Sequence, residues 1–187
     1  MHKFIERNFQ TTDSFPKVLE IGSDQGQHRR FVRHQYTRYV QCDLHLPRET
    51  TQDFRVQSVI GDIERLPFRN NEFDRVIVTC VLHHLPNPEL PLYEIARVTR
   101  PGGVITILFP KEPSLVYSYV RNSLMLVKHK NLRKVERYKE LHQQQHIGDY
   151  KKIIQTVKEN KLFEIKELRR FPIPPLTLLY CFLLIRV

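Results

Sequence analysis

Residues 18–26 read VLEIGSDQG, a short apolar run that leads directly into a turn with two glycines. The run is long enough for one β-strand, and a glycine lets a ligand approach the backbone because it has no Cβ and accepts positive φ. We expect a helix over residues 25–33, whose first N–H groups would face the same ligand. Asp43 ends the next apolar run, where a carboxylate can accept the two hydroxyls of a ribose. This order is typical of nucleotide-binding α/β folds, including nicotinamide-binding domains.

Outward from this turn, apolar runs alternate with helical patterns, as in a parallel α/β sheet. The runs predict strands at residues 18–21, 39–42, 56–60, 75–79, 104–108, 163–171 and 176–187. A helix is predicted over residues 90–98, with an inward face formed by Leu90, Tyr93 or Ile95, Ala96 and Val98. A turn at residues 100–103 should stop it, and a second helix is predicted over residues 149–159, with Ile153, Ile154 and Val157 inward. Prolines between the last two strands suit an antiparallel hairpin at a sheet edge.

The net charge of +10 is unevenly distributed over the 187 residues. Residues 111–187 carry 16 Lys and Arg against 7 Asp and Glu, whereas residues 1–110 are nearly balanced. Two interpretations stay open: solvated helix faces, or attraction to an anionic substrate, a nucleic acid or a membrane surface. The three cysteines lie far apart without a CxxC pair, and no apolar run reaches the length of a membrane span. We expect a cytoplasmic protein, with contact at a membrane periphery as an alternative.

Four later segments separate the candidate folds. In order, they are GDIERLPF at residues 61–68, FDRVI at 73–77, VLHHLP at 81–86 and EIARVTRPGG at 94–103. With the glycine turn, they resemble the class I S-adenosylmethionine-dependent methyltransferases, and in particular the small-molecule family that includes the ubiquinone and menaquinone biosynthesis enzymes. The resemblance covers residues 17–110, about half of the chain.

The resemblance implies a doubly wound, Rossmann-like α/β sheet of seven strands in the order 3-2-1-4-5-7-6, with the last strand antiparallel. Residues 1–187 would form one methyltransferase domain, and residues 111–148 would be a helical lid inserted between the fifth strand and the last helix. The implied cofactor is S-adenosylmethionine, with S-adenosylhomocysteine as product. The residues assigned to it are Glu20, Gly22, Ser23 and Gly26 at the methionine part, Asp43 at the ribose, Leu44, Asp62 and Ile63 at the adenine, and Cys80 at the amino-acid end.

Asp24 departs from the family pattern, which usually has glycine at this place. Aspartate tolerates a left-handed backbone better than most residues but less well than glycine. Its carboxylate would lie near the cofactor carboxylate. Asp24 therefore either contacts the cofactor ammonium or weakens cofactor binding, and we expect that binding is retained.

Histidines are the candidates for acid–base chemistry, because imidazole titrates near neutral pH. His83 and His84 follow the fourth strand, and His84 is the preferred catalytic residue; packing against the turn at residues 86–88 is the alternative. His146 and Tyr119 are placed on the substrate side. No metal site is expected, since no carboxylate or cysteine has supporting spacing.

The predicted reaction is methyl transfer to an O, N or C atom of a small molecule. An apolar segment at residues 115–124 followed by basic residues suits an amphipathic or anionic acceptor, or an enzyme resting on a membrane. An RNA or other nucleic-acid methyltransferase is the alternative, although no Asn-Pro-Pro-Tyr-like motif follows the fourth strand. A non-catalytic relative with the same fold is the third hypothesis.

Overall fold

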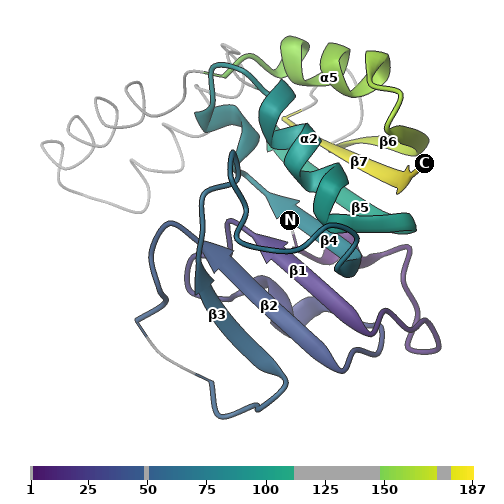
Figure 1. Ribbon diagram of the computed structural model, residues 1–187. Helices are drawn as coiled ribbons and strands as arrows, with labels where there is room; N and C mark the ends of the chain where they lie inside the picture. Colours follow the sequence, from purple (N-terminus) through teal and green to yellow (C-terminus); the bar gives the residue numbers. More distant parts are fainter. Residues whose placement is uncertain (1, 49–50, 112–147, 172–177) are drawn as a thin grey trace, which may run out of the picture.

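The computed structural model describes residues 2–48, 51–111, 148–171 and 178–187, and seven strands in these residues form one sheet (Figure 1). The strands are β1 (Lys17–Ile21), β2 (Arg38–Asp43), β3 (Val56–Ile60), β4 (Phe73–Thr79), β5 (Thr99–Pro110), β6 (Phe163–Phe171) and β7 (Leu179–Arg186). Their order is β3-β2-β1-β4-β5-β7-β6, and β7 is antiparallel to both of its neighbours. The first five strands pair in parallel. The predicted strand order and the antiparallel last strand are confirmed.

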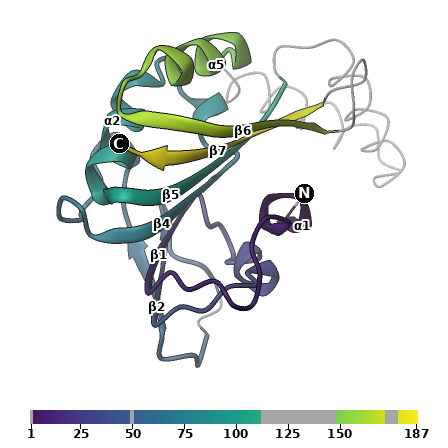
Figure 2. The ribbon, with the colours of Figure 1, turned by 90° about the vertical axis from the view of Figure 1, so that its right-hand side faces the viewer.

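Helices cover both faces of the sheet unequally (Figure 2). The helical elements are α1 (His2–Glu6), η1 (His28–Phe31), η2 (Leu82–His84), α2 (Glu89–Val98) and α5 (Tyr150–Glu159), where η marks a 3₁₀ turn. We call the side covered by α2 and α5 the helical face, and the side covered by α1 and η1 the N-terminal face. No helix in the described part of the chain is long and apolar enough to cross a bilayer.

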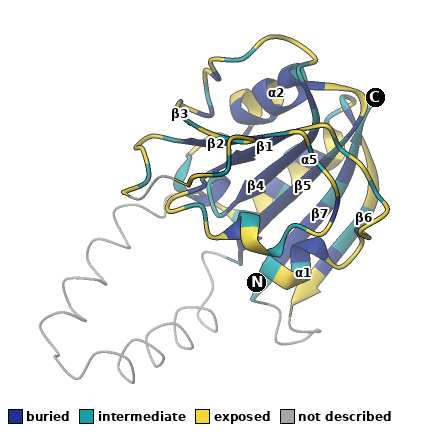
Figure 3. Cartoon of the chain, turned by 90° about the horizontal axis from the view of Figure 1, so that it is seen from below, coloured by how far each residue is buried: buried dark blue, intermediate teal, exposed yellow. Residues whose placement is uncertain are grey.

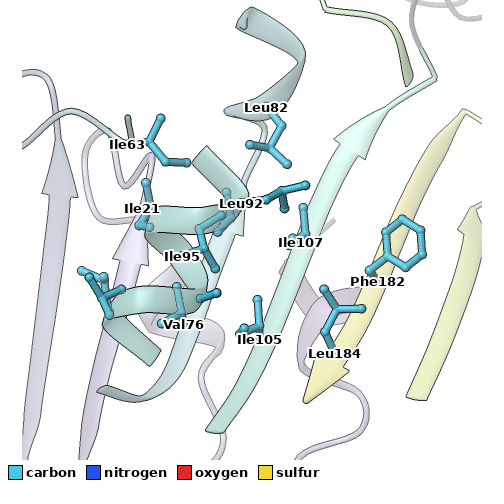
Figure 4. Close-up of a cluster of buried hydrophobic side chains, with 14 of the residues drawn as sticks. Ile21, Ile63, Val76, Leu82, Leu92, Ile95, Ile105, Ile107, Phe182 and Leu184 are labelled. Atoms are coloured by element: carbon cyan, nitrogen blue, oxygen red, sulfur yellow. The ribbon is translucent and has the colours of Figure 1, made fainter. Parts of the chain in front are cut away.

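The helical face holds most of the apolar core (Figure 4). Alternate residues of the strands point toward it because strand side chains alternate between the two faces. Ile95 of α2 and Ile107 of β5 are fully buried there, as are Ile153 and Val157 of α5. Figure 3 shows that burial is concentrated in the central strands. Each such side chain contributes roughly 1.5–3 kcal/mol through its removal from water.

The prediction of a helix over residues 25–33 is wrong, because only the 3₁₀ turn of η1 forms there. Gly26 has φ +68 inside the expected first turn, and Gln27 makes no side-chain cap. The only apolar residues, Phe31 and Val32, are adjacent in sequence, so they cannot form an apolar helix face. Val32 then continues in an extended conformation.

The inward face predicted for α2 is partly wrong. Ile95, Ala96 and Val98 are buried as expected, and Tyr93, the alternative to Ile95, is 55% exposed. Leu90 was expected inside but is 50% exposed. At about 100° per residue, Leu90 lies about 160° around the helix from Leu92, and Tyr93 lies about 100° from it. Leu92, which the prediction missed, is fully buried.

Strand β5 begins directly after α2, five residues earlier than predicted. The turn predicted at residues 100–103 lies inside β5, where it forms an irregularity of the strand. The pairing with β4 shifts register between Phe73 and Arg75, and Gly102 has φ +72. The last hairpin is antiparallel with β6 at the edge, as predicted. Its proline connection lies outside the described residues, as does nearly all of the predicted lid.

Candidate functional site

A cavity of about 500 Å³ opens at the carboxyl ends of the first four strands. In parallel α/β sheets ligands bind at this edge, and the volume lies within the ordinary range for small-ligand pockets. The cavity is lined by His2, Glu20, Ile21, Gly22, Ser23, Asp24, Gln27, His28, Cys42, Asp43, Leu44, Gly61, Asp62, Ile63, Thr79, Cys80, Val81, His84 and Leu85. With Asp24 included, ten residues were assigned to the cofactor, and nine of them are in this set; Gly26 is not.

The turn after β1 requires glycine at two positions. Gly22 has φ +75, and a Cβ there would overlap the side chain of Val81 and lie 3.0 Å from the carbonyl oxygen of Thr79. Gly26 has φ +68, and a Cβ there would overlap the amide of Gln41. Gly22 thus lets the turn lie against the loop after β4 at the cavity wall, whereas Gly26 lets it pack against β2.

Asp24 adopts the left-handed backbone that a glycine would take, with φ +45. Its backbone N–H donates to Oδ2 of Asp43 at 2.9 Å, and its own Oδ1 accepts from Gln25 Nε2 at 3.1 Å. Aspartate at this position therefore keeps the turn in the shape that a glycine would give it, and the bond to Asp43 comes from the backbone N–H, which a glycine would also supply. Both aspartates are among the residues that line the cavity.

Asp43 and Asp62 mark the ends of β2 and β3. The carbonyl oxygen of Asp43 accepts the N–H of Gly61, which joins the two strand ends at 2.9 Å. Oδ1 of Asp62 accepts the N–H of Glu64 at 2.9 Å, so the turn after β3 fixes this carboxylate. Beside them, Leu44 is 62% exposed although it is apolar. Two anchored carboxylates next to an exposed apolar side chain suit a ribose and an adenine.

Glu20 is buried at the back of the cavity, where it accepts the hydroxyl of Tyr39 at 2.8 Å. Burial raises the pKa of Glu20 to about 7, although the neighbouring His28 and the Tyr39 hydrogen bond act in the opposite direction. This carboxyl group therefore changes charge near neutral pH. A ligand ammonium beside it would favour the ionised form.

A chain of buried polar contacts joins the cavity to the N-terminal face. Arg75 of β4 is fully buried and donates two hydrogen bonds to Glu6, at 2.6 and 3.0 Å. Glu6 also bonds His28 Nε2 at 2.9 Å, and His28 Nδ1 lies 3.0 Å from His2 Nδ1. Burial alone would raise the pKa of Glu6, but the bonds from His28 and Arg75 outweigh it and lower the pKa to about 2. Glu6 therefore stays ionised and holds α1 against the sheet.

The two candidate catalytic histidines differ in position. His84 lines the cavity, whereas His83 is buried outside its lining. The carbonyl oxygen of His83 accepts the N–H of Gly148, where the chain returns to the described region. Cys80, just before them, has φ +55 and donates its N–H to Leu108, so it is held in a tight turn at the end of β4. This arrangement favours His84 as the group that meets a substrate.

Sequence reasoning did not identify several lining residues. The proposed substrate-side residues His146 and Tyr119 lie outside the described residues. Among the missed residues, His2 and His28 are far apart in sequence and belong to no motif, so only the fold brings them together. Cys42 and Gly61 had a signal, because each stands next to an assigned aspartate at a strand end.

Residues 19–107 match the protein family described as "Methyltransferase domain". The chain is 39% identical over 67 residues to a demethylmenaquinone methyltransferase of Staphylococcus saprophyticus, a match that covers 36% of this chain and 29% of that protein. It is 38% identical over 60 residues to the ubiquinone/menaquinone biosynthesis C-methyltransferase UbiE of Coxiella burnetii, which covers 32% of this chain and 24% of that one. The aligned segment thus spans less than a third of each of these curated relatives.

A solved structure of a geranyl diphosphate methyltransferase in complex with S-adenosylmethionine shares the fold. Its TM-score is 0.70 at 11% identity, over 100% of this chain and 84% of that one. The phosphoethanolamine N-methyltransferase 2 of Haemonchus contortus, also with S-adenosylmethionine, has a TM-score of 0.67 at 15% identity, over 99% and 52%. Sequence and fold together support the resemblance to class I methyltransferases.

Proposed function

We propose that this chain, in which residues 19–107 are a methyltransferase domain of class I fold, transfers a methyl group from S-adenosylmethionine to an O, N or C atom of a small molecule. The observation that carries the proposal is the cavity at the ends of β1 to β4, with Glu20, Asp43 and Asp62 spaced along one edge of the sheet. The motifs and the geometry of this edge both support the proposal.

The residues present fit the cofactor. Glycine at position 22 removes the Cβ that would overlap Val81, and the backbone at this turn can therefore approach a ligand. Asp43 would accept the ribose hydroxyls and Asp62 would meet the adenine amino group, with Ile63 packed on the ring. Glu20 would bind the ammonium. The cofactor supplies an activated methyl group on its sulfonium.

The protein's own part in the reaction is mainly positioning. The chain must hold the acceptor in line with the methyl group and keep water out, which accounts for much of the rate in such transfers. His84 would accept a proton from a hydroxyl or a protonated nitrogen. Substitution of His84 by Gln should lower turnover and leave the affinity for S-adenosylhomocysteine unchanged. An equal loss of affinity would assign His84 to the cofactor instead.

Calorimetric titration with S-adenosylhomocysteine tests the cofactor assignment. Wild type should bind, and Asp43→Ala should weaken binding by roughly 1.5–3 kcal/mol, because it removes a charge-assisted hydrogen-bond partner. Asp53→Ala is the matched control, since this aspartate pairs with Arg55 outside the cavity lining. Absence of binding by wild type would favour a non-catalytic relative, and unchanged affinity in Asp43→Ala would refute the ribose assignment.

The acceptor is proposed only by class. The excess of Lys and Arg after residue 110 supports an amphipathic or anionic acceptor, reached at a membrane surface or in the cytoplasm. Activity on candidate acceptors with and without anionic vesicles would test this. A nucleic-acid acceptor would instead show salt-dependent binding of RNA with a steep slope.

A further inference from the structure

The charges around the cavity are unequal. Four acidic residues line it, namely Glu20, Asp24, Asp43 and Asp62. Among the described lining residues there is no lysine or arginine, so the side chains able to carry positive charge are the imidazoles of His2, His28 and His84. A cofactor with an amino-acid end brings a carboxylate as well as an ammonium. The carboxylate needs a donor that the assigned aspartates and Glu20 do not provide.

The histidine pair beside Glu20 can provide this donor. Glu6 is ionised, so His28 Nε2 carries the hydrogen of the bond between them. His28 Nδ1 and His2 Nδ1 share one further hydrogen. Burial and the neighbouring His28 lower the pKa of His2, and a ligand carboxylate beside the ring acts in the opposite direction because it favours the protonated form. The protonated pair carries an N–H on Nε2 of His2, whichever ring formally holds the charge. Only His2 then has a ring nitrogen outside these bonds.

His2 is held in place rather than left to fluctuate at the end of α1. Its ring stacks on Phe31, with centroids 5.0 Å apart and planes at 9°. Ile5, in the same short helix, is buried in the core of the N-terminal face, and Glu6 is bound twice by Arg75. Four residues from His2, the chain is therefore anchored to β4 by a buried ion pair.

We propose that Nε2 of His2 binds the carboxylate at the amino-acid end of the cofactor, while Glu20 binds the ammonium. His28 acts as the positioning residue, because it joins the His2 ring to Glu6. The inference rests on the proposed function and adds to it a carboxylate subsite built from the N-terminal face. It also explains why two histidines outside the family motifs line the cavity.

The affinities for two nucleosides distinguish this subsite from the rest of the cavity. S-adenosylhomocysteine carries the amino-acid end, whereas 5′-methylthioadenosine has the same adenosine without it. His2→Phe keeps an aromatic ring to stack on Phe31 and removes both nitrogens. Calorimetry on the full chain should show a loss of at least about tenfold in affinity for S-adenosylhomocysteine, as for a hydrogen bond to a charged group. Affinity for 5′-methylthioadenosine should change by less than about twofold.

Lys3→Ala is the control, because Lys3 is the exposed neighbour in the same helix, and it should leave both affinities unchanged. His2→Gln, which restores an amide donor, should recover part of the loss. The inference is overturned if His2→Phe binds S-adenosylhomocysteine like wild type, or if it loses both ligands equally. If wild type binds 5′-methylthioadenosine but not S-adenosylhomocysteine, the subsite is wrong and an adenosine site remains. If wild type binds neither, the proposed function itself fails.

Discussion

The two faces of the sheet are built from different chemistry. On the helical face, α2 and α5 bury a continuous apolar cluster against the strands. On the N-terminal face, the apolar cluster is small and borders a buried ion pair, a buried histidine and Glu20. Apolar burial stabilises without demanding partners, whereas each buried charge must be paired. We infer that the helical face supplies stability and that the N-terminal face shapes the cofactor end of the cavity.

Substitution of Arg75 should strongly destabilise the packing of the N-terminal face. Arg75→Met leaves Glu6 buried without its two guanidinium bonds, and we expect the free energy of unfolding to fall by about 3–5 kcal/mol. Urea denaturation measures this loss. The double variant Arg75→Met with Glu6→Leu should recover most of it, because replacement of a whole buried pair by apolar side chains is often neutral.

Arg100→Met is the comparison for that experiment. Arg100 pairs with Asp74 at 2.7 Å but its side chain is 53% exposed, so this ion pair should contribute less than about 1 kcal/mol. Equal effects of the two arginine substitutions would mean that burial does not distinguish the two ion pairs.

A cavity on the helical face should lower stability without changing the ligand site. Ile95→Ala removes a fully buried side chain of α2 and should reduce the free energy of unfolding by about 2–4 kcal/mol. Its affinity for S-adenosylhomocysteine should stay within about twofold of wild type, whereas Arg75→Met should also weaken binding through Glu6 and His28. A parallel loss of affinity in Ile95→Ala would refute the division of roles between the faces.

The pH dependence of stability should report on Glu20, whose pKa rises from 4.5 to about 7 on folding. Below pH 4.5 the carboxyl group is protonated in both states and contributes nothing. As the pH rises from 4.5 to 7, the unfolded chain releases this proton first, so wild type loses stability. Glu20→Gln should therefore match wild type near pH 4.5 and exceed it by about 1–3 kcal/mol at pH 8. Denaturation curves of both proteins at the two pH values measure this difference. If the difference in the free energy of unfolding were the same at both pH values, it would contradict the raised pKa of Glu20.

Most strands were predictable because their signals are local. The strands at 56–60 and 163–171 begin and end where the apolar pattern predicts. The end of α2 also follows from the sequence. The conformation after β1 was predicted wrongly. The glycine turn suggested the start of a helix, but the residues that follow it lack an apolar face. Its place is taken by a 3₁₀ turn whose His28 bonds to Glu6.

The part of the candidate site that could be predicted consists of residues at the ends of strands. Asp43, Asp62 and Glu20 needed only the strand boundaries and the parallel order to be placed at one edge. The sequence favoured His84 over His83 but could not place either side chain, because adjacent residues of a 3₁₀ turn face different surroundings. The fold places only His84 on the cavity.

By itself, the sequence determined the strands, the glycine turn and the acids that end β2 and β3, because these depend on neighbours within a few residues. The tertiary structure alone decided that Glu6 meets Arg75, 69 positions away, and that His2 meets His28, 26 positions away. Such contacts depend on how α1 packs on the sheet, and no local pattern encodes that packing. The side chains that join the cavity to the N-terminal face come together only when the sheet has formed, since the sheet supplies the surface on which α1 is held.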